Sequence, residues 1–198
     1  MKKLTWLCLC FLILSLVSAG FAGQDAAPSQ QLQSVAPILW QPSMNVFRRF
    51  ASEPKAMYDF YGKVLGLKQL TTFALGGNTS VARFQAGASE FKLSGKVPNR
   101  LYQKGGVQEA TGLRLLTFFF PDQAPLVERF RANNLPAPEF RSIPDSKRSS
   151  ALVKDPDGQW VELVVVPDAP AGTFDQIEIG LTVSDIDASR KFYREFVG

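Results

Sequence analysis

A single carboxylate on an apolar strand is the side chain in this sequence that most needs a chemical partner. Glu162 lies in the run 159–166, which follows a turn and favours a strand. Because strand faces alternate, Trp160, Glu162 and Val164 share one face. A buried carboxylate requires a cation or another partner, whereas the wetted face of an antiparallel sheet requires none. Glu162 is therefore the first candidate for a metal-binding or ion-paired site, with a solvated face as the alternative.

The turn before this strand, Asp-Pro-Asp-Gly at 155–158, positions Glu162. Proline presets φ for the first corner of a type I turn, and Gly158 allows the chain to leave it, so the pattern predicts a hairpin. We expect a positive φ at Gly158. Turn chemistry explains both Asp155 and Asp157, and we interpret them as turn residues rather than as a catalytic pair.

The sequence excludes much of the usual catalytic chemistry. It contains no histidine, and its two cysteines, Cys8 and Cys10, lie in an N-terminal apolar run. Thiol nucleophiles, imidazole bases and Cys or His metal sites are therefore not expected in the mature chain. Any metal would need oxygen ligands. Acid–base chemistry would depend on Glu162, Lys92 or a tyrosine.

The first residues are typical of a secretory signal. Met1, Lys2 and Lys3 precede an apolar run at 4–17 and small residues at 18–23. We predict a signal peptide at 1–22, cleaved after Ala19 or Ala22, and export to the periplasm or the extracellular space, with no membrane attachment after cleavage. Without Lys2 and Lys3, 20 basic residues (22 − 2) face 18 acidic ones, a net charge of +2, which does not predict nucleic-acid binding.

Turn signals and periodicity divide the rest of the chain. A Gln-, Ala-, Pro- and Ser-rich flexible linker is expected at 23–43, followed by a domain at 44–168. The domain shows the order strand, helix, three strands twice, which predicts the α+β class: duplicated βαβββ modules forming one cupped mixed sheet. The expected strands are 44–51, 67–75, 79–85, 89–96, 112–120, 138–143, 149–154 and 159–166, and the expected helices run from the N-cap Ser52 to Gly66 and over 122–134.

A longer-range repeat begins near the C-terminus. Residues 52–66 align without gaps to 184–198, an offset of 132 (184 − 52). The strand-like run 176–183 precedes this second copy of the helix. We interpret 175–198 as the first strand and helix of an incomplete second domain.

These segments together resemble the vicinal oxygen chelate (VOC) superfamily, which includes glyoxalase I, bleomycin-resistance proteins and extradiol dioxygenases. The resembling residues are FYGKVLGL at 60–67, DPDGQWVEL at 155–163, and LTVSDI at 181–186 with Phe192 and Tyr193. The resemblance covers 44–168 fully and 176–198 as an opening.

The resemblance implies four positions for side chains that bind a divalent metal in metal-dependent members. Counting from the matching motifs places them at Val46, at Lys92, at Leu113 or Leu115, and at Glu162, with Glu178 at the first position of the second copy. Only Glu162 matches. One carboxylate does not hold a hard cation, which takes about six oxygen ligands. We therefore expect a vestigial metal site, no catalytic residue and no cofactor in 44–168.

The same positions define the expected ligand pocket. Arg48 should share the strand face of Val46, with Arg49 opposite, and a one-residue bulge would exchange them. We expect a Lys92–Glu162 ion pair at the floor of the pocket, which Arg48 could join. The candidate pocket residues are Val46, Arg48, Lys92, Leu113, Leu115, Trp160 and Glu162.

Three functions remain open. The favoured one is an exported, metal-free domain that binds a small anionic or aromatic molecule. The second is a metal-dependent lyase, isomerase or dioxygenase whose ligands lie largely in a missing second domain, with Glu178 among them. The third is a structural partner domain. Pairing with a second VOC domain or in a homodimer is compatible with each.

Overall fold

The computed structural model describes residues 43–76, 79–95, 105–170, 174 and 176–197. The chain divides into two units, Met1–Gln33 and Ser34–Gly198, and every described residue belongs to the second. The predicted signal peptide and the predicted linker, except Ser43, lie outside the described residues. None of the described helices combines the length and the apolar character needed to cross a lipid bilayer.

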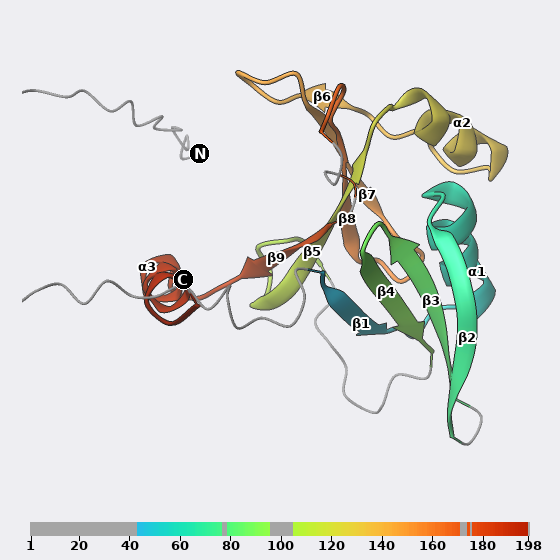
Figure 1. Cartoon of the computed structure of the whole chain (residues 1–198), viewed down its shortest axis with the longest axis horizontal. Helices are drawn as coiled ribbons and strands as arrows, with labels where there is room; N and C mark the ends of the chain where they lie inside the picture. The colour runs from blue at the N-terminus through green and yellow to red at the C-terminus, as the bar shows by residue number, and fades with distance from the viewer. Residues whose placement is uncertain (1–42, 77–78, 96–104, 171–173, 175, 198) are drawn as a thin grey trace, which may run out of the picture. The chain divides into compact units, whose positions relative to one another are not determined.

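The first half of the domain is a βαβββ module (Figure 1). Its strands form a four-stranded sheet in the order β1-β4-β3-β2, in which β1 is parallel to β4 and the other neighbours are antiparallel. The helix α1 continues into a π-helical segment, η2, and Gly66 follows it with φ +79. The elements are β1 (Asn45–Arg49), α1 (Pro54–Asp59), η2 (Phe60–Val64), β2 (Lys68–Gly76), β3 (Thr79–Ala86) and β4 (Ser89–Ser94).

The second half repeats this order and gains one strand from the C-terminal segment. Its sheet has the order β6-β7-β8-β5-β9, with β5 parallel to β8 and antiparallel to β9. The elements are β5 (Gly112–Phe120), α2 (Ala124–Ala132), β6 (Arg141–Ser142), β7 (Ser149–Lys154), β8 (Trp160–Val165) and β9 (Ile177–Thr182).

The α+β class and the duplicated βαβββ order are thus confirmed. Hydrogen bonds divide the strands between two mixed sheets, a finer division than the one cupped sheet expected from the sequence. The predicted strand at 138–143 is reduced to Arg141–Ser142. Pro136 and Pro138 lie just before it, and proline lacks the N–H that a sheet ladder requires.

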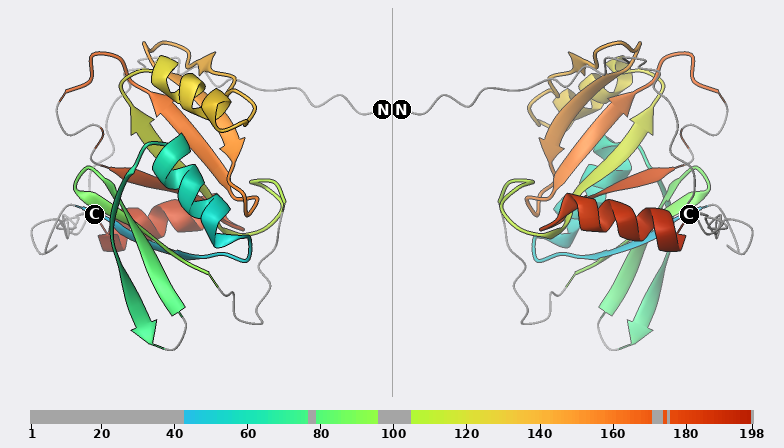
Figure 2. Two further views of the ribbon diagram at one scale, coloured as in Figure 1. Left: turned by 90° about the vertical axis from the view of Figure 1, so that its right-hand side faces the viewer. Right: turned by 90° about the vertical axis from the view of Figure 1, so that its left-hand side faces the viewer.

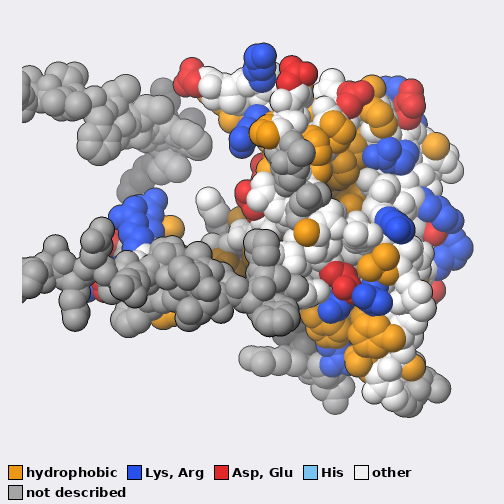
Figure 3. Space-filling model, viewed as in Figure 1, with side chains coloured by type: hydrophobic (Ala, Val, Ile, Leu, Met, Phe, Trp, Pro, Cys, Tyr) orange, Lys and Arg blue, Asp and Glu red, His pale blue; other side chains and the backbone are white. Residues whose placement is uncertain are grey.

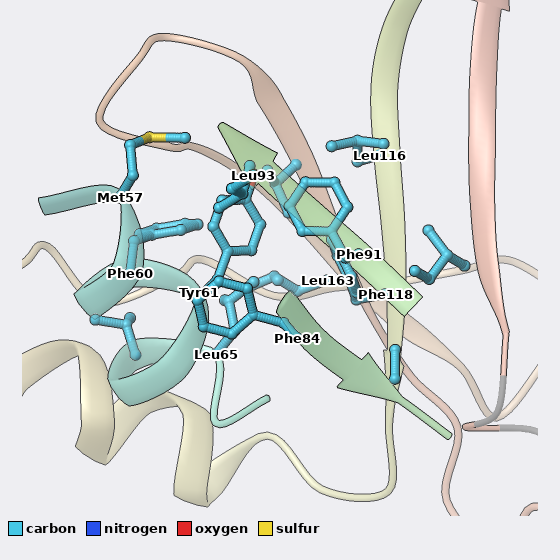
Figure 4. Close-up of a cluster of buried hydrophobic side chains, with 14 of the residues drawn as sticks. Met57, Phe60, Tyr61, Leu65, Phe84, Phe91, Leu93, Leu116, Phe118 and Leu163 are labelled. Atoms are coloured by element: carbon cyan, nitrogen blue, oxygen red, sulfur yellow. The ribbon is translucent and has the colours of Figure 1, made fainter. Parts of the chain in front are cut away.

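The helices α1 and α2 cover the same side of the sheets and join the two halves (Figure 2). Phe60 of η2 meets Phe130 of α2 with ring centroids 6.2 Å apart. Tyr61 packs against Phe91 at 4.6 Å, and Phe91 against Phe118 of the other half at 5.8 Å (Figure 4). Since these rings come from both halves, one hydrophobic core holds them together.

The C-terminal helix contributes nothing to this core. After β9, α3 (Ile186–Phe192) begins at Asp185, whose side chain accepts the N–H of Ala188 at 2.8 Å, and it continues into η3 (Tyr193–Val197). No residue of α3 is buried. Phe192 is 51% exposed, whereas its counterpart in the repeat, Phe60, is 3% exposed. The assignment of 175–198 to a second domain stays a prediction.

Candidate functional site

The two aspartates of the hairpin turn form a buried ionic network with Arg48. The guanidinium donates to Asp155 Oδ2 and, at 3.0 Å, to Asp157 Oδ2. The side chains of Asp155 and Asp157 are 0% and 2% exposed, and that of Arg48 is 10% exposed. Both aspartates are therefore more than turn residues, and Arg48 lies in this network on the core side of β1, beside Val46.

Asp157 also holds the start of α1. Its Oδ1 accepts the N–H of Ala51 at 3.0 Å and of Ser52 at 2.9 Å. The prediction of Ser52 as the N-cap was wrong, because Glu53 occupies that position without a side-chain cap. Among the described residues the Ser52 hydroxyl has no hydrogen-bond partner. A carboxylate from the distant hairpin thus satisfies backbone donors ahead of the helix.

Tyr61 completes the network from η2. Its hydroxyl donates to Asp155 Oδ2 at 2.9 Å. Burial raises the pKa of Tyr61 well above 10.0, and the Asp155 carboxylate acts in the same direction. Burial also raises the pKa of Asp155 above 3.8, while Arg48, the Gln159 backbone and Tyr61 act to lower it. The raised Tyr61 pKa makes this phenol a hydrogen-bond donor rather than a base, and the network holds the hairpin in place.

Glu162 lies on the face of β8 opposite to the core residues Val161 and Leu163, next to Thr117. Its Oε2 accepts the hydroxyl of Thr117 at 3.1 Å. Thr117 pairs in register with Glu162 on one side and with Glu178 of β9 on the other. The sheet therefore places Glu178, the position expected from a second copy, two strands away from Glu162 in the same row, with Thr117 between them.

Lys92 has its ionic contact within its own strand. Its ammonium lies 3.9 Å from Glu90 Oε1, and Glu90 also binds Arg83 of β3 through both carboxylate oxygens. The Arg83 hydrogen bond is the largest effect and lowers the pKa of Glu90 below 4.5; burial, the next largest, raises it, and the charges of Lys92 and Arg83 lower it. Among the described residues no ion pair joins Lys92 to Glu162, so the expected pair does not form in this structure.

The register of β1 corrects the sequence-based placement of Val46. Val46 pairs with Phe91 and is buried in the core, while Phe47 pairs with Lys92. Val46 and Lys92 therefore face opposite sides, contrary to the expectation. In β9 the buried residue is Ile177, an offset of 131 (177 − 46) from Val46, whereas the aligned helices differ by 132. The distance from the buried strand residue to the start of the helix is 8 (54 − 46) in the first case and 9 (186 − 177) in the second, a difference that the gapless alignment from 52 onward does not reveal.

The remaining predicted pocket residues lie on the sheet of β5 and β8. Leu115 pairs with Trp160, and both share the face of Glu162. Leu113 is 38% exposed and precedes a register shift against β9. The Lys154 ammonium lies 4.6 Å from the centroid of the Trp160 ring. Leu115, Trp160 and Glu162 are thus brought together, whereas Arg48 and Val46 lie on the core side of the first sheet.

A row of aromatic and cationic side chains crosses the face of the first sheet that points away from α1 and α2. Phe47 pairs with Lys92, and Lys92 pairs with Arg83 across three adjacent strands. The Arg83 guanidinium carbon lies 5.9 Å from the centroid of Phe73. Phe47 and Phe73 are 51% and 39% exposed. Figure 3 shows basic and acidic side chains beside hydrophobic ones over this sheet. We call Phe47, Lys92, Arg83 and Phe73 the sheet A row.

The metal that some members of such a fold bind does not fit the described side chains. Nowhere in the described part of the chain do three or more His, Cys, Asp or Glu side chains come close enough to share an ion. At the expected positions stand Val46, Lys92, two leucines and Glu162, and the ammonium of Lys92 is itself a cation. The described residues of 44–168 do not form a set of oxygen ligands for a divalent metal.

The sequence matches a model of the Glyoxalase/Bleomycin resistance protein/Dioxygenase superfamily over residues 43–163. The chain belongs to this superfamily. No curated protein matches the sequence.

Solved structures share the fold at low sequence identity. A Bacillus subtilis protein assigned as a dioxygenase is 18% identical with a TM-score of 0.55, and the match covers 78% of this chain and 54% of the Bacillus subtilis chain. A glyoxalase I variant from Zea mays is 20% identical with a TM-score of 0.54, covering 75% and 52%. The protein SMU.1112c is 21% identical with a TM-score of 0.50, covering 64% and 99%. This chain therefore spans about half the length of the first two.

Sequence reasoning missed three parts of the site. Thr117 gave no signal, because its role follows from strand register alone. Phe47 was hidden by the one-residue shift in β1. The ionic role of Asp155 and Asp157 was hidden because both residues suit a turn without any partner.

Proposed function

We propose that residues 44–168 form a metal-free domain that binds a small anionic aromatic molecule on the face of the first sheet that points away from α1 and α2. The observation that carries this proposal is the sheet A row, in which two exposed phenylalanines flank two cations. Arg83 and Lys92 share one carboxylate, Glu90, which leaves a local charge of +1 (2 − 1). Aromatic rings offer stacking surface, and the cations offer charge-assisted hydrogen bonds to an acid.

The absence of a fitting ligand set supports the metal-free part of the proposal. Lys92 occupies a position where metal-dependent relatives place a metal ligand, and a bound divalent ion would be repelled by it. Glu162 meets its hydrogen-bonding need at Thr117. We also propose export through the segment at 1–22, which N-terminal sequencing of the secreted or periplasmic protein tests by the predicted cleavage after Ala19 or Ala22.

The binding test uses the full chain with benzoate as the probe and benzamide as its neutral isostere. Benzoate should raise the midpoint of thermal unfolding and shift the NMR signals of the sheet A row, whereas benzamide should do so much less. Arg83→Met should abolish the benzoate effect, and Lys55→Met, an exposed change on α1, should preserve it. An equal response to both probes, or none to benzoate, would overturn the proposed ligand class.

A second candidate function is a metal-dependent lyase, isomerase or dioxygenase. The observation that favours it is the row Glu162, Thr117 and Glu178, which brings one carboxylate of the second-copy strand toward the one matching metal position. Elemental analysis of the full chain purified without chelators separates the two candidates. Clearly sub-stoichiometric metal supports the metal-free domain, and a stoichiometric divalent metal supports the second candidate.

A further inference from the structure

A comparison of the two halves reveals a strand position that is filled in one and open in the other. In the first half, β2 pairs with β3 from Lys68 opposite Gln85 to Gly76 opposite Thr79. In the second half, the counterpart β6 pairs only with Ser149 and Ser150 of β7. Among the described strands, none pairs with the remaining part of β7, 151–154, on that side.

The sequence explains why this edge is open. After α2 the chain reads Leu135-Pro136-Ala137-Pro138, where the first half has the strand residues that follow its helix. Two prolines at alternate positions remove two backbone donors and fix φ near −65°. The segment therefore follows β7 without joining its ladder, and the edge keeps backbone groups that can bind another strand.

A pocket of about 780 Å³ lies at this open edge. Its apolar lining includes Phe60 and Val64 of η2 and Phe130 of α2, and its sides are residues 135–139 and 152–156. In the first half, the strand that leaves the helix fills the equivalent position, beginning at Lys68. The pocket thus combines an unpaired strand edge with an apolar surface between the helices of both halves.

The charges at the pocket favour an uncharged occupant. Asp59 is neutralised by Lys55 and by Lys63, whose ammonium lies 2.9 Å away. Asp155 is paired with Arg48. Glu139 and Lys154, of opposite sign, remain at the exposed rim. A charged ligand therefore gains no net attraction here.

From the open edge and the apolar pocket, we propose that β7 binds an extended, uncharged peptide segment as an added strand at 151–154. The peptide backbone hydrogen-bonds to the edge, and alternate apolar side chains enter the pocket over Phe60 and Phe130. An added strand lies at the same edge of β7 as β6, in line with it, and restores the pairing that β2 provides in the first half. This site is separate from the sheet A row.

The test uses the full chain and a pool of capped octapeptides with alternating apolar and uncharged polar residues. Hydrogen exchange with the best-binding peptide should slow at 151–154 by about tenfold or more, with little change in β4. The same peptide methylated at alternate amide nitrogens should lose this effect, because it cannot donate to the edge.

Two matched variants locate the site. Ala56→Trp places a large side chain at the pocket, where Ala56 is exposed, and should abolish protection. Ala132→Trp, an equally exposed change on α2 outside the pocket lining, should retain it. The proposal is overturned if no peptide in the pool protects 151–154, or if the methylated peptide binds equally well, which would indicate an apolar small-molecule pocket.

Discussion

Replacement of Arg48 by methionine should strongly destabilise the domain. Methionine retains much of the apolar stem but removes the charge that Asp155 and Asp157 share. At 3.0 Å the Arg48–Asp157 attraction alone amounts to about 5.5 kcal/mol at an effective dielectric constant of about 20, before desolvation is subtracted. Breaking a buried pair from one side typically costs about 3–5 kcal/mol, because the carboxylates stay buried without their cation. We expect a loss in this range.

The assay is equilibrium urea unfolding of the full chain at about pH 7, with the loss read from the transition midpoint at constant slope. Arg83→Met is the matched control, because its ion pair with Glu90 is more exposed and its loss should cost much less. Adding Asp155→Asn to Arg48→Met should recover part of the loss. A loss below about 1 kcal/mol for Arg48→Met would refute the reasoning, since an exposed pair costs no more than that.

The pH dependence of the same variant gives an independent check. The pKa of Asp155 is already raised by burial, and removal of Arg48 takes away its largest opposing influence. A group whose pKa is higher in the folded state stabilises the fold below its unfolded pKa, and this contribution is lost as the pH rises through the folded value. The deficit of Arg48→Met should therefore shrink as the pH falls from about 7 toward the unfolded value near 3.8. An unchanged deficit would point away from Asp155.

Two further predictions concern the hairpin and the sheet A row. Gly158 has φ +84, so Gly158→Val should lower the free energy of unfolding by about 1–3 kcal/mol, measured by thermal unfolding. Gly158→Asn should cost less, because asparagine tolerates positive φ, and equal losses for the two variants would contradict the conformational explanation. Arg83 lowers the pKa of Glu90, so the ion pair stabilises the fold above about pH 4.5, and this stabilisation is lost as the pH falls through the lowered pKa. Glu90→Gln should therefore flatten the dependence of unfolding on pH in the acid range. An unaltered pH profile of unfolding would exclude the contribution of this ion pair.

Local patterns in the sequence predicted most of the fold. The strands Gly112–Phe120 and Ser149–Lys154 were predicted to the residue, because turn residues bound each β-favouring run. The positive φ of Gly158 followed from the turn motif and is confirmed. The strand predicted at 138–143 was too long, because the apolar and β-favouring residues outweighed the effect of two prolines.

The candidate site was harder to predict, because it depends on register and on distant partners. A shift of one residue in β1 moves Val46 into the core and Phe47 to the free face, and the sequence pattern tolerates both. Arg48 and Asp157 are 109 residues apart, so no local pattern links them. Glu53 at the N-cap of α1 shows the same limit, since Asp157 of the distant hairpin accepts the backbone N–H groups of Ala51 and Ser52 just ahead of the helix.

The ionic contacts explain why the expected Lys92–Glu162 pair does not form. Glu90 is two residues from Lys92 on the same strand face, and Thr117 lies directly opposite Glu162, so each side chain finds a partner within its own sheet. Pairing within one sheet costs less side-chain conformational entropy than an ion pair between the two sheets would. The first sheet consequently keeps its cations and the second its carboxylates. At 3.9 Å, Lys92 is held loosely enough by Glu90 for a ligand carboxylate to compete for its ammonium, whereas Glu162 and Glu178 repel the same ligand. This separation of charge supports the proposed binding of an anionic ligand at the sheet A row.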